Sequence, residues 1–134
     1  MPPEGRPSDS TLRWLNHARA DLALARVPLP SEGLYEHLCF HAHQAAEKGL
    51  KAILLHFGIE FPFTHNLQTL LSLLPQTTEV PEEVAESVDL NPYAVAARYP
   101  SLAEPVTHGE YLTAVRQAEA VSDRQKPLSI GRWN

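Results

Sequence analysis

Apolar residues recur every three or four positions along most of this chain, the spacing that places them on one face of an α-helix. The first run of this kind contains Leu12, Leu15, Ala18, Leu22 and Ala25. Asp9 or Ser10 is placed to cap its start, because either side chain can accept a hydrogen bond from a free helix N–H group. Pro28 and Pro30 stop it, since proline removes a backbone donor. The pattern predicts a first helix between these signals.

The second run is longer and has two faces. Ser31 is a suitable cap for its start and Gly58 a suitable end. The apolar side collects Leu38, Cys39, Ala42, Ala46, Leu50, Ile53, Leu54 and Phe57. The opposite side carries the residues called here the polar stripe: His37, His41, Gln44, Glu47, Lys48 and Lys51. Gly49 falls within the apolar arc, where the missing side chain permits close approach of another helix.

Two further helices are predicted before residue 100. Thr64 is placed to cap the first, which ends at Pro75 and carries Leu67, Leu70, Leu71 and Leu74. The second starts at residues 81–83, where a proline and two acids suit a helix N-terminus. Asn91 can cap a restart of this helix, which closes at Tyr99 before the next proline.

A last helix begins at a capping box formed by Thr107 and Glu110. Neither strand-like alternation nor an internal repeat is present. The sequence therefore predicts an all-α protein, an antiparallel up-and-down bundle of four to five helices over residues 8–126. Residues 1–7 read as a disordered tail and residues 127–134 as a C-terminal tail.

Composition narrows the class of protein. A chain of 134 residues with 43% hydrophobic and 20% charged residues suits one folded domain. Its net charge of −5 argues against broad, non-specific binding of nucleic acid. The single cysteine, Cys39, cannot form an intramolecular disulfide. With no apolar run of membrane-span length and no signal-peptide core, we expect a cytoplasmic protein without membrane contact.

The histidines of the polar stripe raise the question of a metal. His37 and His41 are four residues apart and could face one zinc ion, but the stripe offers only Gln44 as a third ligand. The chain also has no H-E-x-x-H or E-x-x-H motif. We therefore predict neither a metal nor a cofactor. The stripe is then either a solvent-exposed face with a Glu47–Lys51 ion pair, or an interface with a second protomer.

Two blocks of the sequence resemble the HEPN domains, small helical bundles of bacteria and archaea. The first block is FHAHQAAEKGLKAILLHFGIEFPFTHNLQTLL, which starts at Phe40, and the second is LNPYAVAARYP, which ends at Pro100. Matching positions of the first block are Phe40, His41, Gln44, Glu47, Lys48, Lys51, Gly58, Pro62, Thr64, His65 and Leu67. Those of the second are Tyr93, Arg98, Tyr99 and Pro100.

The resemblance implies a four- to five-helix bundle that is often a homodimer and often encoded beside a minimal nucleotidyltransferase. Such pairs act as toxin–antitoxin modules in which the helical protein is an RNase toxin. Other members are accessory domains that bind nucleotides. For this chain the resemblance therefore implies a homodimer, a nucleotidyltransferase partner, and a nucleotide or RNA as ligand.

Catalytic members carry an arginine and a histidine separated by roughly four to six residues, a pair suited to metal-independent attack of a ribose 2′-hydroxyl on phosphate. The candidate pair here is Arg98 and His108, with nine residues between them. This spacing departs from the family pattern. An RNase that uses this pair at a dimer interface is the alternative to a binding role.

The second block also suggests a binding site. Tyr93 and Tyr99 could stack on a base while Arg98 contacts phosphate, although tyrosines at helical spacing also suit a core. We expect four polar-stripe residues, His37, His41, Gln44 and Lys48, to face this site or a second protomer. The last three of them are also predicted to bind the nucleotide or RNA.

Overall fold

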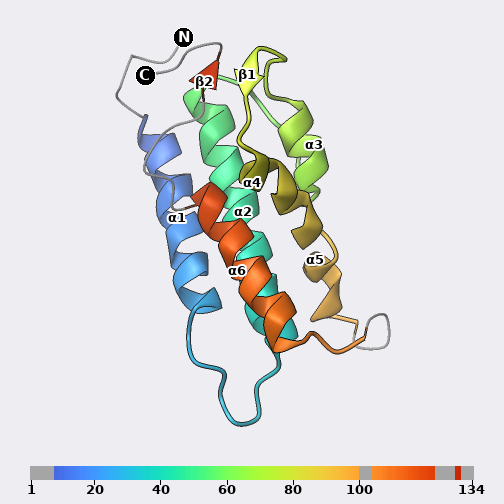
Figure 1. Ribbon diagram of the computed structural model, residues 1–134. Coiled ribbons are helices and arrows are strands. Elements are labelled where there is room, and N and C mark those ends of the chain that lie inside the picture. Colours follow the sequence, from blue (N-terminus) through green and yellow to red (C-terminus); the bar gives the residue numbers. More distant parts are fainter. Residues whose placement is uncertain (1–7, 100–103, 123–128, 131–134) are drawn as a thin grey trace.

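The computed structural model describes residues 8–99, 104–122 and 129–130. Three long helices lie side by side: α1 (Asp9–Ala25), α2 (Tyr35–His56) and α6 (His108–Ser122). The fourth arm of the bundle is a run of short elements: α4 (Glu82–Ala85), the 3₁₀ helix η1 (Glu86–Leu90) and α5 (Tyr93–Ala96). The short helix α3 (Leu67–Ser72) lies beside this arm and runs in the opposite direction, with its start next to the end of η1. Consecutive arms run in opposite directions (Figure 1). The prediction of an all-α up-and-down bundle is confirmed.

Helix α2 is the centre of the bundle and packs against both α1 and α6. Small side chains allow these helices to approach closely, and a Cβ atom at Gly49 would lie 2.9 Å from Val121 Cγ1 and 3.2 Å from Ser122 Cα. The predicted close approach at Gly49 is therefore confirmed. Cys39 is fully buried in the same core, and burial raises the pKa of its thiol to about 12.

Several helix ends differ from the sequence prediction. Helix α1 is capped by Ser8, whose Oγ accepts from Thr11 N at 3.1 Å, so the prediction of Asp9 or Ser10 was wrong. Helix α2 starts after Leu34 without a side-chain cap, so the cap predicted at Ser31 was also wrong. The physical reason is a turn, closed by Gly33 N donating to Pro30 O at 2.8 Å, which places Ser31 outside the helix.

The caps of α3 and α5 also needed correction. Asn66 caps α3 by accepting from Gln68 N at 2.9 Å, while Thr64 Oγ1 accepts from Asn66 N just before the helix. Asn91 Oδ1 accepts from Leu67 N at 2.9 Å, so this side chain joins the start of α3 to the end of η1 instead of capping α5. The Asn91 side chain thus makes a long-range hydrogen bond in place of the local cap that was predicted for it.

Two other end signals were correct, whereas the helix predicted to close at Tyr99 ends at Ala96. Gly58, just beyond α2, has φ 72°, a left-handed conformation that glycine adopts without strain. At the start of α6, Thr107 N donates to Glu110 Oε1 at 2.9 Å and Glu110 N donates to Thr107 Oγ1 at 3.1 Å. These two bonds confirm the capping box.

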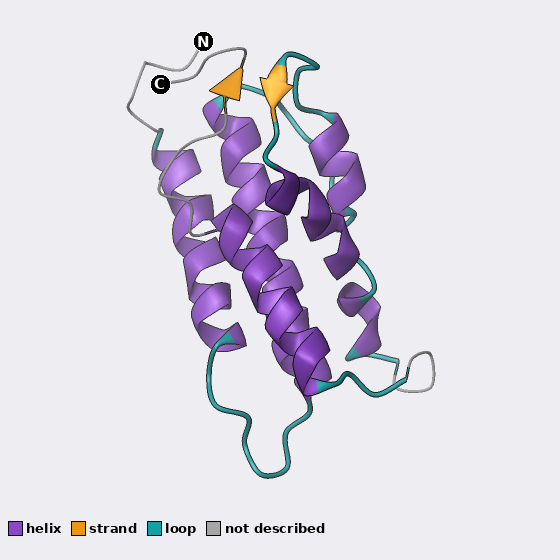
Figure 2. Ribbon diagram, viewed as in Figure 1, coloured by secondary structure: helices purple, strands orange, loops and turns teal. Residues whose placement is uncertain are grey.

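One pair of strands was not expected. Strand β1 (Thr78–Glu79) pairs antiparallel with β2 (Ser129–Ile130), and Figure 2 shows both at the end of the bundle opposite the α1–α2 turn. The tails predicted at 1–7 and 127–134 lie outside the described residues, apart from β2. No helix in the described ranges has the length and apolar character needed to cross a bilayer.

Candidate functional site

Helix α1 covers part of the polar stripe. Asp21, a buried residue of α1, accepts from Lys48 Nζ at 2.6 Å and lies 3.0 Å from His41 Nδ1 through its other carboxylate oxygen. His41 and Lys48, which were predicted to bind a nucleotide, therefore already face the carboxylate of Asp21. Asp21 was not predicted from the sequence. It lies three residues after Ala18, within the apolar arc of the first helix, and an acidic residue at such a position indicates a buried polar partner.

The Glu47–Lys51 pair is formed, but it is not on an exposed face. Lys51 Nζ donates to Glu47 Oε2 at 2.9 Å, and the two side chains are only 6% and 4% exposed. Lys51 Nζ also lies 5.3 Å from the centroid of the Trp14 ring and 5.4 Å from that of Phe61. Of the two alternatives left open for the stripe, solvent exposure is wrong at this pair, because α1 and the segment after α2 both cover it.

Two histidines attach the segment after α2 to that helix. His65 Nδ1 lies 2.9 Å from Glu47 Oε1, and the backbone oxygen of His65 lies 2.9 Å from His43 Nε2. His43 is fully buried, and burial lowers its pKa although the charge of Glu47 opposes the shift. A neutral His43 that donates from Nε2 satisfies this carbonyl. Glu47, His43 and His65 therefore fix the fold of this segment.

The exposed part of the predicted site lies where α5 meets α2. Arg98 Cζ lies 5.4 Å from the centroid of the Phe40 ring, and Arg98 itself is exposed. Tyr99 is 55% exposed. The Phe40 ring meets the ring of His41 edge-on at 5.5 Å. We call Phe40, His41, Arg98 and Tyr99 the Arg98 patch. Gln44, one turn beyond Phe40 on α2, is half-buried.

His108 is held at the start of α2. Its Nδ1 atom lies 2.9 Å from Tyr35 Oη, and Tyr35 in turn stacks on Tyr111 at 4.9 Å. Arg98 and His108 therefore contact different residues of α2, Phe40 and Tyr35, which are about 7.5 Å apart along a helix axis. Both predicted catalytic residues lie near the N-terminal end of α2, but the contacts of the described residues do not join them directly.

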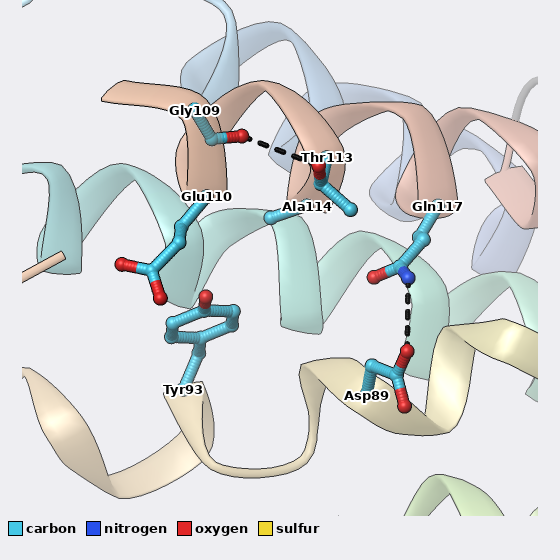
Figure 3. A pocket seen from close by; sticks show the side chains of 7 residues that line it. All are labelled: Asp89, Tyr93, Gly109, Glu110, Thr113, Ala114 and Gln117. Carbon is cyan, nitrogen blue, oxygen red and sulfur yellow. Dashed lines mark hydrogen bonds between the residues drawn. The ribbon is translucent and has the colours of Figure 1, made fainter. Parts of the chain in front are cut away.

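Tyr93 lies in a different environment, a pocket of about 260 Å³ between the η1–α5 segment and α6. Figure 3 shows its ring beside Glu110, with Asp89 and Gln117 at the other end of the pocket. Burial and nearby acidic groups, including these two carboxylates, raise the pKa of Tyr93 to about 12. Among the described residues, no lysine or arginine lines this pocket. The acidic lining of this pocket is unfavourable for a phosphate. Tyr93 therefore belongs to a different environment from the Arg98 patch.

Metal ligands do not gather in the part of the chain that the structure describes: no three histidine, cysteine, aspartate or glutamate side chains there are placed to hold one ion. His37 and His41, the pair considered for zinc, instead line the surface pocket at the α1–α2 turn.

Comparison with known proteins agrees with this fold. The sequence profile of the HEPN domain matches residues 11–127. The chain is similar to TT1696 from Thermus thermophilus, with 32% identity and a TM-score of 0.74 over 87% of this chain and 95% of that one. It is also similar to ST0689, an archaeal HEPN homologue, with 26% identity and a TM-score of 0.65 over 87% and 94% of the two chains. A comparison with curated proteins found no match.

The family profile thus spans nearly the whole bundle, from α1 through α6. The sequence identity to TT1696 is at a level typical of homologous proteins, and the match covers almost the full length of TT1696. The chain therefore belongs to the HEPN domain family.

Proposed function

We propose that this protein is the helical component of a two-protein module with a minimal nucleotidyltransferase, and that it binds a nucleotide or a single-stranded RNA end at the Arg98 patch. The observation that supports this ligand most directly is the exposed Arg98 guanidinium over the face of Phe40. The partner and the toxin–antitoxin role rest on the family resemblance. A cytoplasmic location belongs to the same proposal.

The chemistry of the patch suits a phosphate and a base. A guanidinium over an aromatic face is held there by the ring quadrupole, which leaves its edge N–H groups available for bidentate binding of phosphate. Tyr99 adds a second aromatic ring next in sequence, more than half exposed, on which a base can stack. The patch thus offers both contacts that a nucleotide needs.

The charge distribution favours a small ligand over a long nucleic acid. Lys48 faces Asp21, so its charge is compensated within the protein, and the Nδ1 atom of His41 already contacts the same carboxylate. Arg98 is then the main cation that the patch offers to phosphate. Because Arg98 would neutralise roughly one phosphate, a higher salt concentration should weaken binding only slightly. The affinity of a protein that contacts many phosphates along a duplex depends much more steeply on salt.

Titration calorimetry with ATP tests this proposal. Arg98→Ala removes the phosphate contact and should weaken binding by at least about tenfold, the scale of one charge-assisted hydrogen-bonding group. Arg116→Ala is the matched control, because Arg116 is an arginine on α6 away from the patch. Equal ATP affinity of wild type and Arg98→Ala contradicts the binding site.

The partner is tested separately by co-expression with the product of the adjacent gene. A nucleotidyltransferase there that co-purifies with this protein in fixed stoichiometry supports the module. An adjacent product of another class, or a nucleotidyltransferase that does not co-purify, contradicts it.

A metal-independent RNase is the second candidate, and the hydrogen bond between Tyr35 and His108 favours it. This bond fixes the ring of His108 at the end of the bundle where Arg98 lies. The reaction requires the 2′-hydroxyl to lose its proton to a base as its oxygen attacks phosphate, while the 5′-oxygen leaves as it gains a proton. Cleavage of transfer RNA in the presence of a chelator, lost in both Arg98→Ala and His108→Ala, would support it; no cleavage by the wild type contradicts it.

A further inference from the structure

The turn between α1 and α2 borders a hollow with mostly apolar walls. Leu24, Val27, Leu29 and Leu34 line it, and each of these side chains is between 36% and 54% exposed. The hollow has a volume of about 320 Å³, within the range of roughly 300–1,000 Å³ that is usual for small-molecule sites. We call it the turn pocket. Its size and lining suit a small apolar molecule.

The turn pocket is already formed in the isolated chain. Gly33 N donates to Pro30 O at 2.8 Å and closes the turn. A Cβ atom at Gly33 would lie 2.9 Å from Pro30 Cδ and 3.1 Å from Leu29 Cδ1, so the loop is closely packed. A ligand would therefore meet a preformed site and lose little free energy in ordering the loop.

A buried carboxylate sets the tautomer of His41. Asp21 Oδ1 lies 3.0 Å from His41 Nδ1, and Asp21 Oδ2 accepts from Lys48 Nζ at 2.6 Å. A carboxylate that is paired with a lysine can only accept hydrogen bonds, so Nδ1 is the protonated nitrogen of the neutral His41 ring. The Nε2 atom of the same ring then carries a lone pair and is a hydrogen-bond acceptor.

This acceptor faces the turn pocket. His41 lines the pocket and Asp21 does not, so the Nδ1 edge of the ring points away from the hollow and the Nε2 edge is left to face it. Among the described residues, none forms a hydrogen bond with Nε2. The other ionisable groups of the lining are His37 and Glu32, and both are exposed. The pocket thus combines apolar walls with an acceptor that is oriented from behind.

The acceptor selects the polar group of the ligand. A carboxylate would place a lone pair against His41 Nε2 and a second negative charge near Glu32, so an anion is unfavourable here. An ammonium group would lose much of its hydration among leucine side chains, at a high cost in free energy. A neutral hydroxyl can donate to Nε2 and costs far less to desolvate.

We propose that the turn pocket binds a small apolar molecule with one hydroxyl group, such as an alkylphenol, whose hydroxyl donates to His41 Nε2 and whose apolar body packs against Leu24 and Leu34. Asp21 is a positioning residue for this site, because it holds His41 in the acceptor tautomer. Arg98 does not line the turn pocket, so this ligand is additional to the proposed nucleotide.

NMR titration of the isotope-labelled full chain with 4-ethylphenol and with 4-ethylanisole, its methyl ether, tests this site. The two probes have the same apolar body, but the ether has no donor. The wild type should bind the phenol saturably, with a Kd on the order of 1 mM or tighter. It should bind the ether at least about fivefold more weakly, because the hydrogen bond is lost. The shifts should centre on Leu24, Leu34 and His41.

Three variants identify the contacts. His41→Phe keeps an aromatic ring without Nε2 and should bind the two probes with equal affinity. His17→Phe is the matched control, since His17 is an exposed histidine of α1, and it should keep the preference for the phenol. Leu34→Asp places a charge in the apolar wall and should abolish binding of both probes. Circular dichroism should show the helix content of the wild type in all three.

The role of Asp21 is tested by ¹⁵N NMR of the imidazole nitrogens. His41 of the wild type should carry its proton on Nδ1. In Asp21→Asn the amide oxygen can still accept from Lys48 while the amide N–H₂ group donates to Nδ1, so the proton should move to Nε2. Because Nε2–H can donate to an ether oxygen, the preference for the phenol should then fall below about twofold.

Each contrary outcome falls on a stated part of the proposal. If 4-ethylphenol gives no saturable shift, or shifts centred on the pocket of Tyr93, the turn pocket is not its site. Equal affinity of the wild type for both probes, or a preference that persists in His41→Phe, overturns the hydroxyl contact. A proton on Nε2 of wild-type His41 overturns the role of Asp21. The effect of Arg98→Ala on ATP binding is measured independently, so the nucleotide site stands or fails by itself.

Discussion

Asp21 of α1 bridges two residues of α2, with His41 Nδ1 at 3.0 Å from one carboxylate oxygen and Lys48 Nζ at 2.6 Å from the other. This bridge fastens α1 across the helix that carries the family signature. It also compensates the charge of Lys48, which the sequence alone presents as free to meet a phosphate. The bridge therefore determines both the stability of the α1–α2 packing and the charge of the surface beside the Arg98 patch.

Asp21→Asn should destabilise the protein by about 1–3 kcal/mol, because a largely buried lysine and a histidine lose their charged acceptor. Urea unfolding followed by circular dichroism measures the change. Asp89→Asn is the control, since Asp89 is exposed and its bond to Gln117 is on the surface; it should change stability by less than about 0.5 kcal/mol. Equal stability of the two variants would refute the role of Asp21.

Removing one member of the buried Glu47–Lys51 pair should cost more than removing both. Glu47→Gln leaves Lys51 buried without its counter-charge, which costs about 3–5 kcal/mol. The double variant Glu47→Gln with Lys51→Met should recover part of this loss, because no unpaired charge remains. A double-mutant cycle from urea unfolding gives the coupling energy. Additive effects of the two substitutions would show that the pair is not energetically coupled.

His43 should make the fold less stable in acid. Burial lowers its pKa in the folded state below the ordinary value of 6.5, so the unfolded chain binds the proton more readily. Stability is therefore highest above the unfolded pKa and falls as the pH drops below it toward the folded pKa. His56 contributes in the same direction, since burial lowers its pKa too.

The matched variants for this effect are His43→Gln and His17→Gln. The first retains a side-chain donor for the carbonyl of His65 and should flatten the loss of stability between neutral and mildly acidic pH. The second changes an exposed histidine of α1 and should retain the slope of the wild type. Parallel pH profiles for wild type and His43→Gln would exclude His43 as a cause.

Gly49→Ala should destabilise the bundle although alanine is the better helix former. The added Cβ would lie 2.9 Å from Val121 Cγ1 and 3.2 Å from the backbone of Ser122, which requires α6 to shift. Overpacking of this kind costs about 1–3 kcal/mol, more than the roughly 1 kcal/mol gained in helix propensity. Thermal unfolding should show a lower Tm.

Gly109→Ala is the opposite case on α6. A Cβ atom there meets nothing within 4 Å, so the substitution should stabilise the protein by up to about 1 kcal/mol through helix propensity alone. A stabilised Gly49→Ala, or two variants that behave alike, would contradict the close contact between α2 and α6.

Local signals predicted much of the fold. The capping box at Thr107 and the end of α2 at Gly58 depend on residues within one turn, and both are as expected. The cap expected at Ser31 failed because a turn between Pro30 and Gly33 competes with helix formation there. Strand β1 has two residues, too few for any alternation to show in the sequence.

The candidate site was less predictable, since its charge depends on contacts between distant segments. The helical wheel found the polar stripe, but it could not show that Asp21 of α1 meets Lys48 or that Glu47 is covered. The same limitation applies to the tyrosines. Tyr93 and Tyr99 are near in sequence, yet one lines an acidic pocket while the other is exposed beside Arg98.

The central claim is that the Arg98 patch binds a nucleotide, and NMR chemical-shift mapping of the isotope-labelled protein during titration with ATP tests it most directly. We predict saturable shifts centred on Arg98, Tyr99 and Phe40, with little change at Tyr93 and none of these shifts in Arg98→Ala. No saturable shift in the wild type, or shifts centred on the pocket of Tyr93, would contradict it.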